Sequence, residues 1–298
     1  MKALRIGSRG SALALWQAEH VSARLGALGH SAEIRVIVTT GDRTEGRLDS
    51  VGGKGAFLKE IEEALLTDEI DLAVHSLKDV PVSLPRGLVL CAVLERADPR
   101  DALVSATGTA FAELPAGARI GTTSLRRRAQ LLAARPDLGV ADLRGNVDTR
   151  LRKLREGGFD AIVIASAGIT RLGRAAEITE PLDPGLLLPA PGQGAIALEC
   201  RDADVRVATA VQPLHHPESA WAVEAERALL EGLGGDCNVP LGALAEVQGA
   251  ELWLRALVAR EDGSALLRGE RRGSRGRDLG AALADELLAR GARELLRP

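Results

Sequence analysis

The first two thirds of the chain alternate short apolar runs with longer amphipathic stretches. Apolar runs rich in Val, Ile and Leu predict strands over residues 3–7, 32–40, 71–76, 88–95, 101–106, 118–123, 140–144, 159–166 and 194–200. Apolar residues at helical spacing predict helices over residues 11–28, 56–66, 124–134, 147–156 and 204–214. Strands that alternate with helices are typical of βαβ units and mostly parallel sheets.

After His216 the pattern becomes that of a small α+β domain. Residues 217–233 predict a helix, two alternating runs on either side of residues 261–264 predict a hairpin, and residues 277–296 predict an amphipathic helix. We therefore predict an α/β fold of two lobes with mixed, mostly parallel sheets and a small α+β C-terminal domain. The predicted domains are residues 1–96 with 193–215, residues 97–192, and residues 216–298.

Cysteine use and hydropathy favour a soluble cytoplasmic protein. The 298 residues contain three cysteines without C-x-x-C spacing, which fits neither a disulfide framework nor a zinc site. The first residues interrupt their apolar stretch with arginines, unlike a signal peptide, and no later stretch predicts a membrane span. His215 and His216 lack the spacing of a metal motif, so we expect no metal and no membrane partner.

Charge distribution points to an anionic ligand. The net charge of −3 argues against a general nucleic-acid binder, but residues 119–155 hold ten basic and three acidic side chains, a local charge of +7. Polar clusters also follow the predicted strands, at residues 8–9, 76–79, 122–127 and 144–150. The carboxyl edge of an α/β sheet is where ligands bind, although such residues also serve as helix caps or solvated surface.

The segment HSLKDVP, residues 75–81, carries the most chemistry. Pro81 tends to end a strand, so Lys78 and Asp79 are expected to project from a loop. A carboxylate beside cations stabilises a developing positive charge or passes a proton; the alternative is an ion pair that closes the loop. His75, inside an apolar run, fits a core histidine better than a catalyst.

Two glycine-rich loops differ from common motifs. VGGKGAF does not match a phosphate-binding P-loop, because Leu48 replaces the first glycine and Gly55 follows Lys54. This loop either brings Lys54 over a ligand or merely precedes a helix. GGDCNVP places Cys237 among glycine and proline, whereas Cys91 and Cys200 lie in apolar runs that are typical of packed thiols.

Eight segments together resemble the porphobilinogen deaminase (hydroxymethylbilane synthase) family over essentially the whole chain. They are RIGSRGSALALWQ, VGGKGAFLKEIE, DLAVHSLKDVP, ERADPRDALVS, GTTSLRRRAQL, LRGNVDTRLRKL, LPAPGQGAIALECR and GGDCNVPLGALAE. The resemblance implies condensation of four porphobilinogen molecules, with loss of ammonia, to hydroxymethylbilane for tetrapyrrole synthesis. It also implies two lobes similar to periplasmic binding proteins and a third domain that carries the cofactor cysteine. Nothing in the sequence indicates an obligate partner, and we expect a monomer.

The resemblance also implies roles for individual residues. Cys237 matches the cysteine that holds the family's dipyrromethane cofactor through a thioether, and Asp79 matches the catalytic carboxylate. Cofactor contacts are implied for Ser76, Lys78, Thr122, Ser124, Arg126, Arg127, Arg144 and Arg150. Substrate contacts are implied for Arg9, Ser11, Gln17, Lys54, Phe57 and Arg171. Ser50 stands where some members have lysine, which puts one contact in doubt.

Two other functions fit parts of the sequence. A non-catalytic two-lobed anion-binding protein agrees with the first two thirds of the chain but leaves Cys237 unexplained. A cysteine hydrolase or transferase would use Cys237 with His75. Replacing His75 and Asp79 in turn separates a cysteine–histidine enzyme from the deaminase reading.

Overall fold

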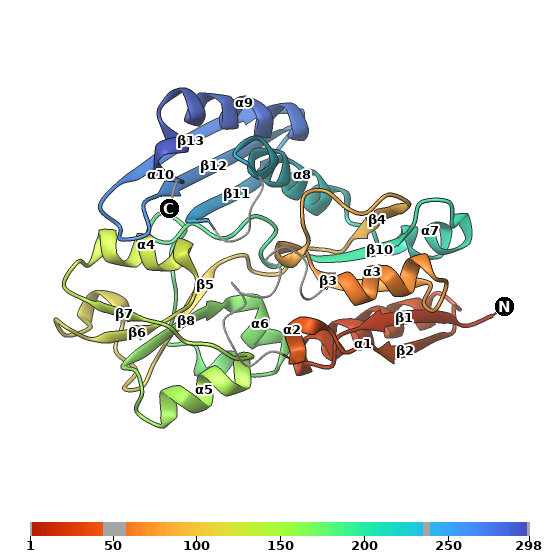
Figure 1. Ribbon diagram of the computed structural model, residues 1–298, viewed down its shortest axis with the longest axis horizontal. Coiled ribbons are helices and arrows are strands. Elements are labelled where there is room, and N and C mark those ends of the chain that lie inside the picture. The colour runs from red at the N-terminus through yellow and green to blue at the C-terminus, as the bar shows by residue number, and fades with distance from the viewer. Residues whose placement is uncertain (1, 44–57, 235–238, 297–298) are drawn as a thin grey trace. The chain divides into compact units, whose positions relative to one another are not determined.

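The computed structural model describes residues 2–43, 58–234 and 239–296 (Figure 1). The chain divides into two compact units, residues 1–96 with 195–220 and residues 97–194 with 221–298. The described residues contain three sheets: a five-stranded sheet in the first unit, and a second five-stranded and a three-stranded sheet in the second unit. The predicted division into three domains stays a prediction.

The sheet of the first unit has the strand order β2-β1-β3-β10-β4. Its strands are β1 (Leu4–Ser8), β2 (Ala32–Val36), β3 (Leu72–Ser76), β4 (Leu88–Val93) and β10 (Ile196–Arg201). The central strand β3 is parallel to β1 and antiparallel to β10, and β10 is antiparallel to β4. One strand therefore runs against the other four, which confirms a mixed, mostly parallel sheet.

Helices cover both faces of this sheet because its strands are apolar on both sides. Side chains of α1 (Ala12–Ala27) and α7 (Val205–Val211) share one core with Leu72 and Val74. Side chains of α3 (Lys59–Leu66) pack with Ala73 on the other face. The shorter elements are α2 (Thr40–Arg43) and the 3₁₀ turns η2 (Leu77–Asp79) and η5 (Gln212–Leu214).

The five-stranded sheet of the second unit repeats the same pattern, with the order β7-β6-β8-β5-β9. Its strands are β5 (Asp101–Ser105), β6 (Arg119–Gly121), β7 (Gly139–Ala141), β8 (Ala161–Ala165) and β9 (Glu180–Pro181). Here β5 is the strand that runs against the other four. One face packs on α4 (Leu125–Ala134), and the other packs on α5 (Val147–Arg155) and α6 (Ser166–Arg171). The short 3₁₀ turns are η3 (Phe111–Glu113) and η4 (Ala175–Glu177).

The second unit also contains an antiparallel three-stranded sheet near the C-terminus. Its strands are β11 (Leu241–Gln248), β12 (Glu251–Ala259) and β13 (Leu266–Gly273). The predicted hairpin is β12 and β13, and the structure adds β11 beside it. Helix α9 (Gly276–Ala289) covers one face of this sheet, and the unit also includes most of α8 (Pro217–Gly232) (Figure 1).

Two predicted boundaries are wrong for local reasons. The predicted helix over residues 277–296 is two helices, α9 and α10 (Ala292–Leu295), because Gly291 between them adopts a φ of 94°, outside the right-handed helical range. The predicted strand over residues 32–40 ends at Val36, since the chain begins α2 at Thr40. The sequence pattern also missed α6 and the two-residue strand β9.

Candidate functional site

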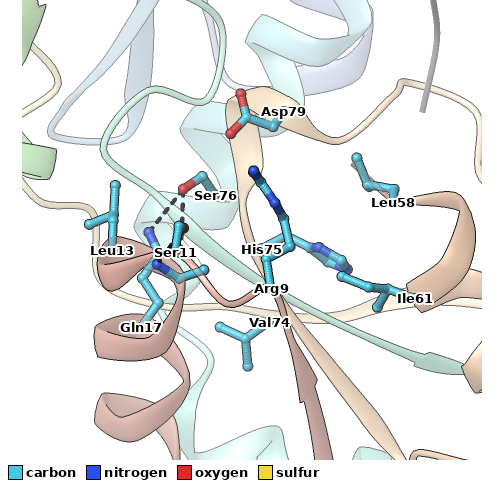
Figure 2. Close-up of a pocket in the computed structure, with 11 residues that line it drawn as sticks. Arg9, Ser11, Leu13, Gln17, Leu58, Ile61, Val74, His75, Ser76 and Asp79 are labelled. Carbon is cyan, nitrogen blue, oxygen red and sulfur yellow. Dashed lines mark hydrogen bonds between the residues drawn. The ribbon is translucent and has the colours of Figure 1, made fainter. Parts of the chain in front are cut away.

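In the first unit, the polar residues that follow β1 and β3 line one pocket of about 90 Å³ (Figure 2). The two strands are parallel neighbours, so their carboxyl ends meet at the same edge of the sheet. Of the residues implied by the family resemblance, this edge brings together Arg9, Ser11, Gln17, Ser76 and Asp79. Leu58 and Ile61, at the start of α3, supply an apolar wall.

Helix α1 positions two of these side chains. Ser11 is its N-cap, and the Oγ atom accepts a hydrogen bond from Ala14 N at 3.4 Å. Gln17 is buried at 2% exposure, and its Nε2 atom donates to Oγ of Ser76 at 2.9 Å (Figure 2). This bond joins α1 to the end of β3, so it holds the Ser76 hydroxyl in place at the pocket wall.

The turn after β3 presents the catalytic candidate. Leu77 and Val80 are each 1% exposed and anchor the turn, and Val80 N donates to Leu77 O at 3.0 Å. Between these anchors Lys78 is half-buried and Asp79 is exposed. Figure 2 shows the Arg9 side chain extending toward the turn that carries Asp79. The pocket therefore combines an accessible carboxylate with a guanidinium group.

His75 lines the same pocket, but its side chain is paired with a buried glutamate. Its Nε2 atom lies 2.9 Å from Oε2 of Glu199, and both side chains are buried. This pairing confirms the prediction of a satisfied core histidine. The other carboxylate oxygen of Glu199, Oε1, is buried without a partner among the described residues. Glu62 lies on α3, and its own burial together with the negative charge of Glu199 raises the pKa of the Glu62 carboxyl above its usual range.

In the second unit, polar residues again follow the carboxyl ends of parallel strands. After β6, the Thr122 hydroxyl oxygen accepts from Ser124 N at 3.2 Å, and Ser124 caps α4 by accepting from Arg127 N at 3.4 Å. After β7, Arg144 is half-buried, and Nε of Arg150 donates to Gly145 O at 2.8 Å. The strand-end clusters predicted from the sequence are therefore present in each unit.

Arg126 and Arg127, whose contacts with the cofactor stay a prediction, both bind a carboxylate of the chain itself. Both guanidinium groups are buried and share Asp101, at 2.8 Å from Arg126 Nη1 and 2.7 Å from Arg127 Nη2. Arg126 Nη1 also donates to Leu188 O, and Arg127 Nη1 donates to Val163 O. The two arginines hold the pKa of Asp101 far below its usual range, and burial lowers the pKa of Arg126. The buried cluster keeps one net positive charge.

Arg171 lies at the end of α6, the helix that follows β8. Burial lowers the pKa of its guanidinium to about 10. Its Nη2 atom donates to Gly194 O at 2.7 Å. The third parallel strand of this sheet thus also leads to a cation at its carboxyl edge.

The sequence reasoning missed two residues at this edge. Asp101 begins β5 directly opposite Ala165, and besides the two arginines it accepts a hydrogen bond from Gln193 Nε2 at 2.9 Å. Ser166 is 2% exposed, and its Oγ atom has no partner among the described residues. The only sequence signal for Asp101 was its position in the segment ERADPRDALVS.

Three residues implied by the family resemblance, Lys54, Phe57 and Cys237, lie outside the described residues. Within the described ranges, no group of three or more His, Cys, Asp or Glu side chains is arranged to hold a metal ion. No helix in the same ranges is both long and apolar enough to cross a membrane. The described donors are hydroxyls, guanidinium groups and an ammonium group, which suit a ligand with several carboxylates.

Comparison with known proteins agrees with this chemistry. Residues 4–209 match the family model described as porphobilinogen deaminase, dipyromethane cofactor binding domain, and residues 220–289 match porphobilinogen deaminase, C-terminal domain. A curated porphobilinogen deaminase from Syntrophobacter fumaroxidans is 50% identical over 300 residues, which cover 99% of this chain and 97% of that protein.

More distant solved structures are also similar. A periplasmic substrate-binding protein of an ABC transporter from Coxiella burnetii is 16% identical with a TM-score of 0.45, and it covers 73% of this chain and 94% of its own. The methionine-binding protein MetQ is 14% identical with a TM-score of 0.44, and it covers 73% of this chain and 92% of its own. The two family models together span almost the whole sequence, and the chain belongs to the porphobilinogen deaminase family.

Proposed function

We propose that this chain joins four porphobilinogen molecules head to tail, with release of one ammonia per molecule, and that one water then releases the product as hydroxymethylbilane for tetrapyrrole biosynthesis. The growing chain extends from a dipyrromethane cofactor attached through a thioether to Cys237. Membership of the family and its cofactor-binding domain support this activity. The observation that carries it is the pocket where Arg9, Ser76 and Asp79 meet.

Substrate recognition follows from charge. Porphobilinogen carries an acetate and a propionate, and a guanidinium group binds a carboxylate through two parallel hydrogen bonds. We assign substrate carboxylate binding to Arg9 and Lys54, with hydrogen bonds from the hydroxyl of Ser11 and the amide of Gln17. The apolar side of the pocket, at Leu58 and Ile61, suits the flat pyrrole ring.

Asp79 is assigned the catalytic role. When the C–N bond of the substrate breaks, the aminomethyl nitrogen leaves as ammonia and the remaining methylene-pyrrolenine is positively charged. An exposed carboxylate at the pocket stabilises this charge. The bound dipyrromethane supplies the nucleophilic α-carbon that forms the new C–C bond. The proton displaced from that α-carbon needs an acceptor, and we assign this role to the carboxylate of Asp79, which lines the pocket.

The cofactor's own carboxylates are assigned to the residues for which the family resemblance implies cofactor contacts. The donors are Ser76, Lys78, Thr122, Ser124, Arg144 and Arg150, and Arg171 contributes a further cation for substrate. This donor set fits an anionic group because hydroxyl, guanidinium and ammonium groups donate hydrogen bonds to carboxylates. Arg126 and Arg127 would act from the buried Asp101 cluster, whose net positive charge attracts the same anion.

Covalent attachment is tested by the intact mass of the denatured protein. The parent should exceed its sequence mass by two condensed pyrroles, and Cys237→Ser should show the bare sequence mass. A parent at the bare mass that gains nothing on incubation with porphobilinogen would overturn the proposal. A mass increase that persists in Cys237→Ser would show that another residue holds the cofactor.

The proposal also covers the cellular location and the oligomeric state of the protein. We place the protein in the cytoplasm, as a monomer that binds neither nucleic acid nor membrane, on the grounds of its cysteine use and charge. Size-exclusion chromatography with light scattering tests the monomer: the expected mass is 31.3 kDa plus the cofactor. A stable mass of twice this value would contradict it.

A further inference from the structure

The second unit contains another cavity that the proposed reaction does not use. It measures about 230 Å³ and lies between the loop of residues 184–188 and the strands β12 and β13. Its lining includes Pro184, Leu188, Ala256 and two arginines, Arg255 and Arg268. All these residues belong to one compact unit. The lining therefore combines an apolar surface with two positive charges and one negative charge, that of Glu270.

The sheet register explains why the two arginines meet. Arg255 lies opposite Glu270, and Leu257, two residues further along β12, lies opposite Arg268. Because side chains two residues apart point to the same side of a strand, Arg255 and Arg268 share one face of the sheet. The opposite face is covered by α9, where Gly269 approaches Leu283 and Leu287. The two guanidinium groups thus stand on the face that α9 leaves open.

These arginines retain hydrogen-bonding capacity. Arg255 pairs through Nη2 with Oε2 of Glu246 at 2.5 Å, but its Nε atom is buried without a partner among the described residues. Arg268 lines the cavity and is exposed, so its guanidinium is accessible to a ligand. Partial desolvation and the neighbouring Arg255 lower the pKa of Arg268. A buried N–H group without an acceptor is costly, and a bound anion would satisfy Nε of Arg255.

The acidic residue in the cavity wall, Glu270, already accepts a hydrogen bond within the protein. Glu270 accepts a hydrogen bond from Nε1 of Trp253 at 3.2 Å. The Trp253 ring in turn lies 4.3 Å from the guanidinium carbon of Arg255. Glu246 and Glu270 thus both have hydrogen-bond partners on the same sheet face, and neither of these partners is Arg268.

We propose that this cavity binds a small organic carboxylate, with its anionic head on Arg268 and Nε of Arg255 and its apolar body against Pro184 and Leu188. The apolar part of the lining favours an organic anion over an inorganic one. This site is distinct from the pocket that contains Asp79, since the two lie in different compact units.

Trp253 provides the readout. The chain has three tryptophans, Trp16, Trp221 and Trp253, so a ¹⁵N-labelled sample gives three indole signals, and Trp253→Phe identifies the one beside the cavity. We expect titration with benzoate to shift the Trp253 signal saturably, and acetate, which lacks the apolar body, to act at higher concentration. Inorganic phosphate at matched ionic strength should shift it least.

Two substitutions on β13 separate a specific site from general charge effects. Arg268→Gln should weaken benzoate binding about tenfold or more, as expected when a charged hydrogen-bond donor is lost. Arg271→Gln removes the same charge from the opposite face, where Arg271 pairs with Glu286 at 3.3 Å, and should bind like the parent. Arg268→Lys, which keeps the charge, should give an intermediate affinity even if the glutamine variant folds poorly.

Three results would overturn this assignment. One is a Trp253 signal that benzoate does not move in the parent protein. Another is equal benzoate affinity in the parent, Arg268→Gln and Arg271→Gln. The third is a phosphate response as strong as that of benzoate, because it would show that any anion occupies the cavity.

Discussion

Arg127 donates two hydrogen bonds to Oδ1 of Asp101, from Nε at 3.0 Å and from Nη2 at 2.7 Å, and both residues are buried. The two residues are 26 positions apart, and Arg126 binds the other oxygen of the same carboxylate. One buried aspartate therefore neutralises part of the charge of two buried arginines. The cluster joins the start of β5 to the start of α4, where several of the proposed cofactor contacts lie.

Replacing Asp101 with asparagine should strongly destabilise the protein. The substitution keeps the shape but leaves two buried guanidinium groups without their counter-charge, which costs about 3–5 kcal/mol. Urea unfolding of Asp101→Asn measures this loss. Asp98→Asn is the control, because Asp98 forms a more exposed pair with Arg100 and should cost about 1 kcal/mol or less. Equal losses in both variants would contradict the role of the buried cluster.

The contribution of Asp101 should also depend on pH. Its carboxyl pKa in the folded protein lies below the usual value of 3.8, so its stabilisation is fully present above that value and is lost as pH falls toward the folded pKa. The difference in melting temperature between the parent and Asp101→Asn should stay constant from pH 7 to about pH 5 and shrink below about pH 4. A difference that grows on acidification would have the wrong sign for this pair.

Asp79 and His75 should respond differently to substitution, although both line the first pocket. Asp79→Asn should lower kcat by about 10²-fold or more without loss of stability, because Asp79 is exposed and acts on the substrate. His75→Gln keeps a hydrogen bond to Glu199 and should retain most activity. Steady-state kinetics with thermal unfolding of each variant checks this. The reverse ranking would favour a cysteine–histidine mechanism.

Arg9 should contribute mainly to substrate binding. Arg9→Met removes a guanidinium group from the pocket wall and should raise KM for porphobilinogen about tenfold, as expected for a lost charged contact. Arg86→Met is a matched control, since Arg86 is exposed and lies outside the pocket lining. An unchanged KM in Arg9→Met would remove Arg9 from the substrate contacts.

Gly194, in the segment PAPGQGA, should tolerate no side chain. Its φ is 90°, and an added Cβ would lie 2.5 Å from Ala97 O. Gly173 has a similar φ of 72° but open space around it. Gly173→Ala should cost about 1–2 kcal/mol from backbone strain alone, whereas Gly194→Ala should cost clearly more. Similar melting temperatures for the two variants would mean that the close contact relaxes freely.

The sequence by itself determined the elements and the kind of ligand. Apolar runs such as DLAVHS and FDAIVIAS predict strands because their side chains are apolar on both faces, and the polar residues after them predict the edge that binds anions. The segments around Asp79 and Cys237 indicated the family, and the match over residues 4–209 and 220–289 confirmed it. Their individual roles stay predictions.

Only the tertiary structure decided which polar residues bind each other. Arg126 and Arg127 lie in GTTSLRRRAQL, and the antiparallel pairing of β5 with β8 brings Asp101 to the same edge, where it binds both. Gln17 and Ser76, 59 residues apart, meet because β1 and β3 are parallel neighbours. Strand order and register are set by packing between distant segments, and local patterns of apolar and polar residues do not encode these contacts.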